Sequence, residues 1–358
     1  MPASATEAGE AAVRAAFAAQ AHWCERMGSP LTALLCRTIG SRIGRDTEVA
    51  RRVLGWPGNP DGWADGLPLR LCGGLHALVR SGKAEALQAC YPPHRLPEEE
   101  VLWDALARTL ETTGEDLLPW LDHPPQTNEV GRSNALMAGL LVIASQFGVP
   151  IRLYELGASA GLNLNLDRYC YDLGGTRAGD PDSPLQLRPD WQGAPPPQAE
   201  VTIIGRGGVD LQPMDPVRDR ERLIAYVWPD QRQRIEQLEK AVAVAEAHPP
   251  LVDRGDAADW LEAQLLIEPE PGVARVVMHS VAYQYFPQEV QARIAGHIGR
   301  VGHNATAESP LAWLRFEKEP QDRQTSLRLT LWPSGKDRLL AYCQAHGRSI
   351  EWLQPPSH

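Results

Sequence analysis

The sequence has no uninterrupted apolar run of about 18 residues, the length that a membrane-spanning helix requires. It also has no Lys/Arg run of the kind that binds nucleic acids. Its formal net charge is −10, and an acidic surface repels phosphate backbones. These absences argue against a membrane protein and against DNA or RNA as the partner. A small molecule or a protein is the expected partner.

The six cysteines include no Cys-x-x-Cys pair, and a chain of 358 residues can bury a core without disulfides. We therefore expect reduced thiols and a cytoplasmic location. The Ala-rich N-terminal segment carries Glu7 and Glu10 and lacks the compact apolar core of a secretory signal. Cys72 and His76 could share one helical face, but without two further ligands nearby we predict no metal site.

The segment up to about Asp122 offers almost no strand-like alternation, and its apolar residues recur at helical spacing. Helices are predicted over Glu10–Met27, Pro30–Ile43, Leu67–Ser81 and Glu98–Thr113. The helix-breaking sequence His123-Pro124-Pro125 then marks a boundary. We expect a helical N-terminal domain or cap over residues 1–126 and a second domain over residues 127–358.

Beyond this boundary, strand and helix patterns alternate, which predicts an α/β fold: a mostly parallel sheet with helices on both faces. The predicted strands are Ile151–Leu156, Val201–Ile204 with Gly208–Leu211, Leu251–Arg254, Ala274–Val281, Leu311–Phe316 and Ser326–Trp332. The predicted helices are Asn128–Phe147, Val217–Ala247 with an interruption at Trp228-Pro229, Ala257–Leu266 and Gln288–Gly299. A short polar turn joins the last two strands, which suggests an antiparallel hairpin at the edge.

The most informative segment follows the first predicted strand. Glu155 stands at the end of that strand, followed by Gly157 and Gly161 in a Gly-x-x-x-Gly pattern and by the start of a predicted helix. Gly157 lets the backbone turn sharply and approach a ligand, and Gly161 permits close packing of helix on sheet. Ligands of open α/β sheets bind at the carboxyl ends of the strands, where this loop falls. A glycine turn that only packs a helix on a strand is the alternative.

The spacing also discriminates between cofactors. A dinucleotide fingerprint needs Gly-x-Gly-x-x-Gly, but Ser159 replaces the middle glycine here. S-adenosylmethionine has no phosphate and is a cation, so an acid such as Glu155 is favourable beside it. The pattern resembles the first motif of class I methyltransferases. This resemblance implies a Rossmann-like, class I methyltransferase-type sheet that binds S-adenosylmethionine through Glu155, Gly157, Ser159 and Gly161.

In that fold, an acid after the second strand binds the ribose hydroxyls and an acid after the third recognises the adenine amino group. Asp210 and Asp256 match these positions, with an insertion at Asp172–Ala199 between the first two strands. Asp210 could instead be a turn residue, and Asp256 a helix N-cap. Arg132 could pair with the carboxylate of the cofactor, or be an ordinary surface or capping arginine.

The order of these motifs, together with Thr127–Ser133, Val227–Gln231 and Leu331–Pro333, resembles a bacterial family named domain of unknown function 2332. The resemblance covers nearly the whole chain. That family is similar to class I methyltransferases in its Rossmann-like core, but the resemblance implies no substrate.

Possible acceptor-side groups follow the fourth predicted strand. His279 could act as a general base, and Tyr283 and Tyr285 could wall the pocket or lie over the sulfonium. His279 could instead be a buried strand-end histidine. The pattern of amine methylation, Asn or Asp before Pro-Pro and an aromatic residue, is absent.

The leading hypothesis is therefore an S-adenosylmethionine-dependent methyltransferase acting on a small molecule, with the helical region as a lid. One alternative is a non-catalytic protein of the same fold that binds the nucleoside cofactor as a partner or sensor. A nicotinamide-dependent oxidoreductase is disfavoured by the missing middle glycine. The sequence names neither the methyl acceptor nor the oligomeric state.

Overall fold

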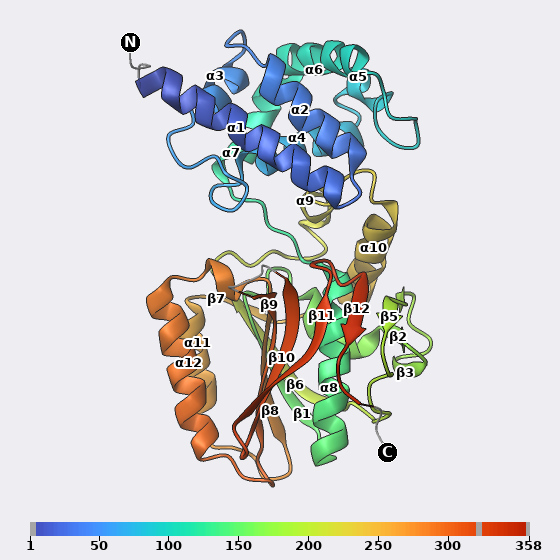
Figure 1. Ribbon diagram of the computed structural model, residues 1–358, viewed down its shortest axis with the longest axis vertical. Helices are drawn as coiled ribbons and strands as arrows, with labels where there is room; N and C mark the ends of the chain where they lie inside the picture. The colour runs from blue at the N-terminus through green and yellow to red at the C-terminus, as the bar shows by residue number, and fades with distance from the viewer. Residues whose placement is uncertain (1–4, 320–323, 356–358) are drawn as a thin grey trace. The chain divides into compact units, whose positions relative to one another are not determined.

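A computed structural model of the chain describes residues 5–319 and 324–355 (Figure 1). The chain divides into two compact units. The helical unit comprises Met1–Thr127 and Arg220–Glu236, and the sheet unit comprises Asn128–Asp219 and Gln237–His358. The sequence predicts residues 220–236 as part of the second domain, whereas here they belong to the helical unit.

The helical unit contains α1 (Ala5–Arg26), α2 (Pro30–Arg42), α3 (Glu48–Leu54), α4 (Leu67–Arg80), α5 (Glu85–Gln88), α6 (Glu99–Thr113), η1 (Gly114–Leu117), α7 (Leu118–Asp122) and α9 (Arg220–Ala225). The four predicted helices correspond to α1, α2, α4 and α6, each within a few residues of its expected ends. Their apolar faces form one core, in which Phe17, Leu35, Leu71 and Leu106 are no more than 1% exposed.

Contacts inside the helical unit explain why residues 220–236 belong to it. The carboxylate of Asp230 accepts hydrogen bonds from the hydroxyl of Ser29 and from the backbone N–H of Leu31 at 2.8 Å. A negative charge at the start of α2 satisfies its first N–H groups and is favoured by the helix dipole. His76 in α4 also lies 3.2 Å from the carbonyl oxygen of Ala225. These contacts join positions up to 201 residues apart, which no local pattern reveals.

The sheet unit is mixed α/β and is built on a nine-stranded, mostly parallel sheet with the order β5-β12-β11-β10-β9-β8-β1-β6-β7. The strands are β1 (Ile151–Leu156), β5 (Asp190–Gln192), β6 (Ile203–Asp210), β7 (Val252–Arg254), β8 (Ala274–Ser280), β9 (Leu311–Lys318), β10 (Thr325–Trp332), β11 (Lys336–Cys343) and β12 (Ser349–Trp352). All strand pairs from β7 across to β9 are parallel. Every residue of β8 is buried, as expected for a central strand covered on both faces.

Helices cover both faces of this sheet (Figure 1). On one face lies α8 (Ser133–Phe147), which packs on β9, β10 and β11. On the other lie α11 (Ala257–Leu266) and α12 (Gln288–His303), which pack on β1, β6 and β9. Neighbouring residues of β9 show the two faces: Leu314 lies against Gly139 of α8, while Trp313 belongs to the core with Ile294 of α12. The remaining long helix is α10 (Arg232–Ala247).

Several sequence predictions need correction. The last two predicted strands do pair antiparallel as β9 and β10, but this hairpin is not at the edge, because β11, β12 and β5 continue the sheet. The two short segments between residues 201 and 211 are one strand, β6. The insertion after the first strand contains a second, three-stranded sheet of β2 (Cys170–Leu173), β3 (Thr176–Gly179) and β4 (Gln186–Leu187).

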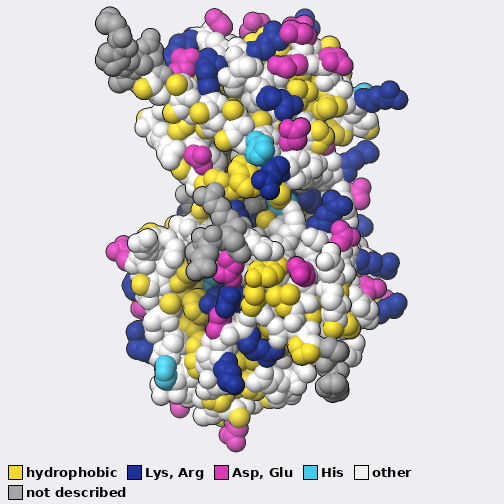
Figure 2. Space-filling view, in the orientation of Figure 1, with side chains coloured by type: hydrophobic (Ala, Val, Ile, Leu, Met, Phe, Trp, Pro, Cys, Tyr) yellow, Lys and Arg dark blue, Asp and Glu magenta, His cyan; other side chains and the backbone are white. Residues whose placement is uncertain are grey.

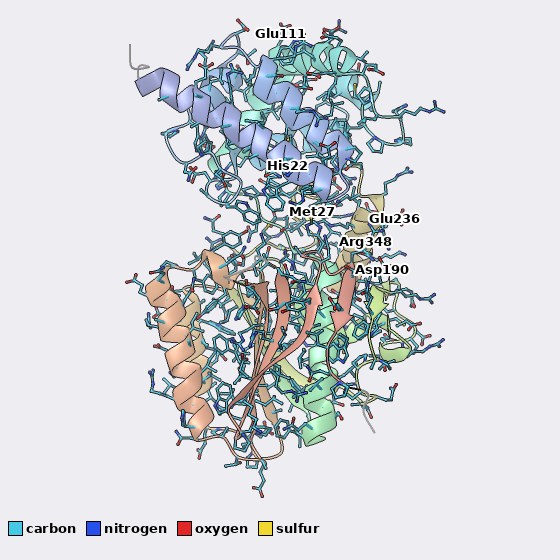
Figure 3. All side chains as sticks on the ribbon, viewed as in Figure 1. His22, Met27, Glu111, Asp190, Glu236 and Arg348 are labelled. Atoms are coloured by element: carbon cyan, nitrogen blue, oxygen red, sulfur yellow. The ribbon has the colours of Figure 1, made fainter. Side chains whose placement is uncertain are left out.

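The edge strand β5 also comes from this insertion and pairs with β12. Asp190 and Arg348 lie side by side there (Figure 3), with the N–H of Asp190 donating to the carbonyl of Arg348 at 2.8 Å. The exposed ion pair between their side chains, at 3.6 Å, adds little. The pairing joins segments about 160 residues apart, so no local pattern in the sequence reveals it.

Within the described parts of the chain, no helix is long and apolar enough to cross a membrane. Basic and acidic side chains are interspersed on the visible surface of each unit (Figure 2).

Candidate functional site

The parallel strands fix where a ligand is expected in the sheet unit. In order of appearance, β1, β6, β7, β8 and β9 occupy the order 3-2-1-4-5 across the sheet. The connections therefore run in opposite directions from the two central strands, β1 and β8. In open α/β sheets, a crevice forms at such a switch point, at the carboxyl ends of the strands.

The loop after β1 lies at this edge and has an unusual backbone. Gly157, Ser159 and Gly161 have positive φ values of 67°, 55° and 71°. The N–H groups of Gly157 and Ala158 donate to the carbonyl of Val209, and the N–H of Ser159 donates to the carboxylate of Asp210 at 2.9 Å. Strand β6 thus holds the bend against the end of β1. The next element is η3 (Leu162–Arg168), a short 3₁₀-helix rather than an α-helix.

Glu155 is the most unusual side chain of the site. It is 2% exposed, and its Oε2 has no hydrogen-bond partner among the described residues. Burial raises the pKa of Glu155 to about 8, with a contribution from the nearby carboxylate of Asp210. The hydrogen bond from the Asn163 side chain and the charge of Arg132 lower that pKa. Its carboxyl group is therefore largely protonated at neutral pH, and a cation beside it would favour its ionised form.

Two further buried polar atoms lie on the same loop without a partner in the described chain: Ser159 Oγ and Asn163 Oδ1. Buried polar atoms are normally hydrogen-bonded, so these three atoms could each form a hydrogen bond with a ligand at this edge. Asn163 was missed from the sequence, although it stands only two residues after Gly161.

Asp210 and Asp256 both lie at the carboxyl edge, Asp210 as the last residue of β6 and Asp256 two residues after β7. Asp210 accepts N–H groups from Ser159 and Gln212, and its carbonyl accepts the N–H of Gly255, which draws the ends of the two strands together. Asp256 Oδ1 caps α11 by accepting from Ala258 and Asp259. Asp210 is thus a turn residue and Asp256 is a helix N-cap, which are the structural alternatives to ligand binding named in the sequence analysis. Both of these capping hydrogen bonds use Oδ1 of Asp256 and neither uses Oδ2.

Arg132 reaches the same edge from η2 (Val130–Arg132), which precedes α8. Its Nη1 donates to the carbonyl of Ser280 at 2.8 Å, and its Nε donates to the carbonyl of Ala345 at 3.1 Å. The guanidinium therefore ties the end of β8 to the turn between β11 and β12. In the same segment, Asn128 Oδ1 accepts the N–H of Leu162 at 2.8 Å and so caps η3. Asn128 belongs to the motif Thr127–Ser133, but its role could not be predicted from the sequence.

His279 lies in a closed network at the end of β8. It is 1% exposed, its Nδ1 lies 2.7 Å from Glu317 Oε1, and its Nε2 accepts the indole N–H of Trp313 at 3.1 Å. This arrangement assigns a neutral ring with the proton on Nδ1. Tyr283 stacks on that ring at 4.8 Å and donates its hydroxyl to the carbonyl of Gln291 at 2.5 Å. Both ring nitrogens and the Tyr283 hydroxyl are thus engaged with the protein itself.

Glu317 also organises the turn after β8. Its Oε1 accepts the N–H groups of Ala282 and Tyr283 at 3.0 and 3.1 Å. This turn contains Val281 at a φ of 50°, a genuine outlier for a β-branched residue. Val281 and Ser159 are the non-glycine residues with positive φ in the described chain, and they follow the two strands at the switch point. Such strain clusters at functional sites.

The turn after β8 lies directly against the glycine loop, since a Cβ on Gly157 would stand 2.5 Å from the Cβ of Ala282. The backbone of the bend is thus covered on one side by protein. Glycine at position 157 is required by packing as well as by its positive φ. Glu317 was missed from the sequence, although an acid following the apolar strand Leu311–Phe316 was a visible signal.

The chain belongs to the bacterial family described as "Uncharacterized protein conserved in bacteria (DUF2332)". The family model matches residues 14–352 and so includes every residue of this site. No curated protein matches the chain. The family description names no reaction, so the chemistry has to be argued from the side chains.

A metal centre finds no support in the described chain, which has no group of three or more His, Cys, Asp or Glu side chains placed to hold an ion. Cys72 and His76 do lie four residues apart in α4. However, Cys72 Sγ lies 3.7 Å from Cys36 Sγ, and His76 Nδ1 lies 3.2 Å from the carbonyl of Ala225.

Proposed function

We propose that this member of the family binds S-adenosylmethionine at the carboxyl edge of β1, β6 and β7 and transfers its methyl group to a small molecule. The observation that carries the proposal is Glu155, a buried carboxyl group with an unpartnered oxygen beside a bend of positive-φ residues. A buried acid needs a donor or a positive charge to balance its burial. The ammonium group of S-adenosylmethionine supplies both.

The neighbouring strand ends suit the nucleoside half of the same molecule. Asp210 would accept hydrogen bonds from the ribose hydroxyls, and Asp256 Oδ2 would accept one from the adenine amino group. The strand order 3-2-1-4-5 supports a Rossmann-like, class I methyltransferase-type core. The antiparallel extension from β10 to β12 does not by itself favour any one cofactor.

The start of η3 argues against a dinucleotide. A pyrophosphate binds at free N–H groups on the first turn of an α-helix, where the dipole favours negative charge. Here a seven-residue 3₁₀-helix follows the loop, and the N–H of Leu162 already donates to Asn128. The carboxylate of Asp210 would also repel a phosphate. S-adenosylmethionine meets neither obstacle.

When bound, S-adenosylmethionine supplies an electrophilic methyl group on a sulfonium. The chain's residues then have to hold the cofactor and orient the acceptor, since positioning provides much of the rate of a displacement. His279 offers no unoccupied nitrogen as a base in this arrangement. We therefore favour an acceptor whose reacting atom carries a lone pair at neutral pH without help from a base, such as a carboxylate.

The hydrogen bonds that His279 and Tyr283 form with the protein itself favour a second candidate function. If no acceptor group is activated at this edge, the family member binds the cofactor or its demethylated product as a partner or sensor. The two candidates share the binding site and differ only in turnover.

Titration calorimetry with S-adenosylmethionine, S-adenosylhomocysteine and NAD tests the site. We expect binding of the first two but not of NAD. Asp210→Asn should weaken binding about tenfold or more, since a hydrogen bond to a charged group contributes about 1.5–3 kcal/mol. Asp182→Asn, a change of an exposed acid in the insertion, is the matched control. Binding of NAD alone, or equal affinity in both variants, would remove the basis of the proposal.

A tritiated-methyl assay against the small-molecule fraction of a bacterial extract then separates the two candidates. Label in an extract compound supports the transferase. Tight binding without any labelled product supports the sensor.

A further inference from the structure

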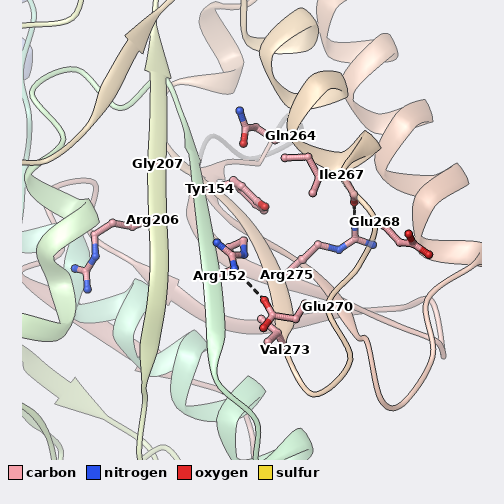
Figure 4. Close-up of a pocket in the computed structure, with 10 residues that line it drawn as sticks. All are labelled: Arg152, Tyr154, Arg206, Gly207, Gln264, Ile267, Glu268, Glu270, Val273 and Arg275. Carbon is pink, nitrogen blue, oxygen red and sulfur yellow. Dashed lines mark hydrogen bonds and ion pairs between the residues drawn. The ribbon is translucent and has the colours of Figure 1, made fainter.

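A pocket lies at the opposite edge of the same sheet, by the amino ends of β1 and β8 (Figure 4). It has a volume of about 290 Å³. Its lining includes Arg152 and Tyr154 of β1, Arg275 of β8, and Ile267 and Glu270 from the chain after α11. Nothing in the proposed function uses these residues.

Arg275 is the feature that requires explanation. The residue is 6% exposed, yet no carboxylate pairs with it in the described chain. Its Nη1 reaches the carbonyl oxygens of Leu265 and Ile267 at the long distances of 3.4 and 3.5 Å, and its Nε has no partner among the described residues. Burial lowers the pKa of Arg275. An unpaired buried charge is among the most unfavourable features that a folded chain can contain.

The end of α11 balances this charge only in part. A helix C-terminus carries roughly half a negative charge, and its effect is confined to the last turn. Glu268 also lines the pocket, but its carboxylate points away from the guanidinium in Figure 4, and the described chain has no ion pair between them. A surplus of positive charge therefore remains at Arg275.

The neighbouring strand adds a second guanidinium. Arg152 is the direct partner of Arg275 in the parallel register of β1 and β8. It pairs with Glu270 at 3.0 Å, but both side chains are well exposed, at 39% and 58%. Together the two arginines outnumber the one carboxylate paired with them. Tyr154 directs its hydroxyl into the space between these groups (Figure 4).

We propose that this pocket binds a small oxyanion, a phosphate or carboxylate group, held by Arg275 with Tyr154 and Arg152. Arg275 supplies N–H donors and the uncompensated charge, and the phenol of Tyr154 supplies an O–H donor. The exposed side chain of Ile267, at 62%, gives the remainder of the ligand an apolar wall. The site is independent of the cofactor edge, and either can exist without the other.

Thermal unfolding of the full chain tests this site, with potassium phosphate and potassium acetate compared against KCl at equal ionic strength. At 100 times its Kd an anion contributes about 2.7 kcal/mol, which should raise the midpoint of a 358-residue chain by about 4 °C. Phosphate also stabilises proteins non-specifically, so the comparison between variants is decisive. The two salts distinguish a phosphate site from a carboxylate site.

Arg275→Met is the informative variant. We expect it to lose the anion-dependent shift and, in KCl, to melt at least as high as the wild type, because it removes an unpaired charge. If Arg275 only caps α11, its replacement by methionine would instead destabilise the chain equally in every salt. Arg293→Met, which removes an exposed arginine of α12, is the matched control and should keep the full shift.

The proposal is overturned if the shift persists in Arg275→Met, or if the wild type shows no shift beyond that in KCl. If Arg275→Met does not fold, Tyr154→Phe takes its place, since the ring is kept and only the hydroxyl is lost. A reduced anion-dependent shift in Tyr154→Phe supports the site, and an unchanged shift contradicts it.

Discussion

Replacing Glu155 with glutamine should change how the stability of the chain depends on pH. Burial raises the pKa of Glu155 to about 8 from an ordinary value of 4.5. Between these values the folded chain holds a proton that the unfolded chain has lost. This contribution to stability is thus complete below about pH 4.5 and is lost as the pH rises towards 8. From pH 6 to pH 8 the loss amounts to about 2 kcal/mol.

Glu155→Gln keeps the shape of the protonated side chain but cannot ionise, so this loss should disappear. Urea unfolding of wild type and variant at pH 6 and pH 8 measures it, with exposed Glu246→Gln of α10 as the control. The difference in unfolding free energy between wild type and Glu155→Gln should change by about 2 kcal/mol over this range. Parallel pH profiles would refute the reasoning, because they would mean that Glu155 is already ionised in the empty site.

The same variant should bind S-adenosylmethionine more weakly. A hydrogen bond to a charged group contributes about 1.5–3 kcal/mol, which corresponds to a loss of roughly 10- to 150-fold in affinity. Unchanged affinity with a changed pH profile would place the cation elsewhere at this edge.

Three further variants test the framework of the site. Gly157→Ala should destabilise the chain by about 1–3 kcal/mol, and adding Ala282→Gly should recover the steric part; a neutral single variant would contradict the close packing at the bend. Arg206→Met removes a bidentate ion pair with Asp167, and the side chains of this pair are only 17% and 18% exposed. The variant should lower the free energy of unfolding, measured in urea, by about 3 kcal/mol. A loss under about 0.5 kcal/mol would mean that solvent screens the pair. Glu317→Gln should speed amide hydrogen exchange in the turn after β8, and unchanged exchange would show that the carboxylate does not hold it.

Much of the sheet could be predicted from the sequence because its signals are local. The strand Ile151–Leu156 and the helix Ala257–Leu266 have the predicted bounds. Gly148-Val149-Pro150 fixes where the strand begins, and Asp256 caps the helix. Both signals act within a few residues, so no knowledge of the fold is needed to use them.

The network around His279 shows what the sequence could not provide. His279 is paired with Arg315 in the register of β8 and β9, so Trp313 and Glu317 lie two residues to either side and on the same face. That register depends on packing across the sheet, and no spacing in the sequence records it. Both ring nitrogens of the histidine that the sequence offers as a general base are therefore occupied.

The helical unit is assembled from two separate segments of the chain, and this has a consequence for its biosynthesis. When the first 127 residues have been translated, the start of α2 still lacks its hydrogen-bond acceptor, because Asp230 is translated much later. At 5–20 residues per second, a ribosome needs roughly 5 to 20 s to travel from the end of the first segment to the end of the second. During that interval α1 to α7 emerge without the capping carboxylate, and a nascent chain stalled before residue 230 should remain more sensitive to protease than one released after residue 236.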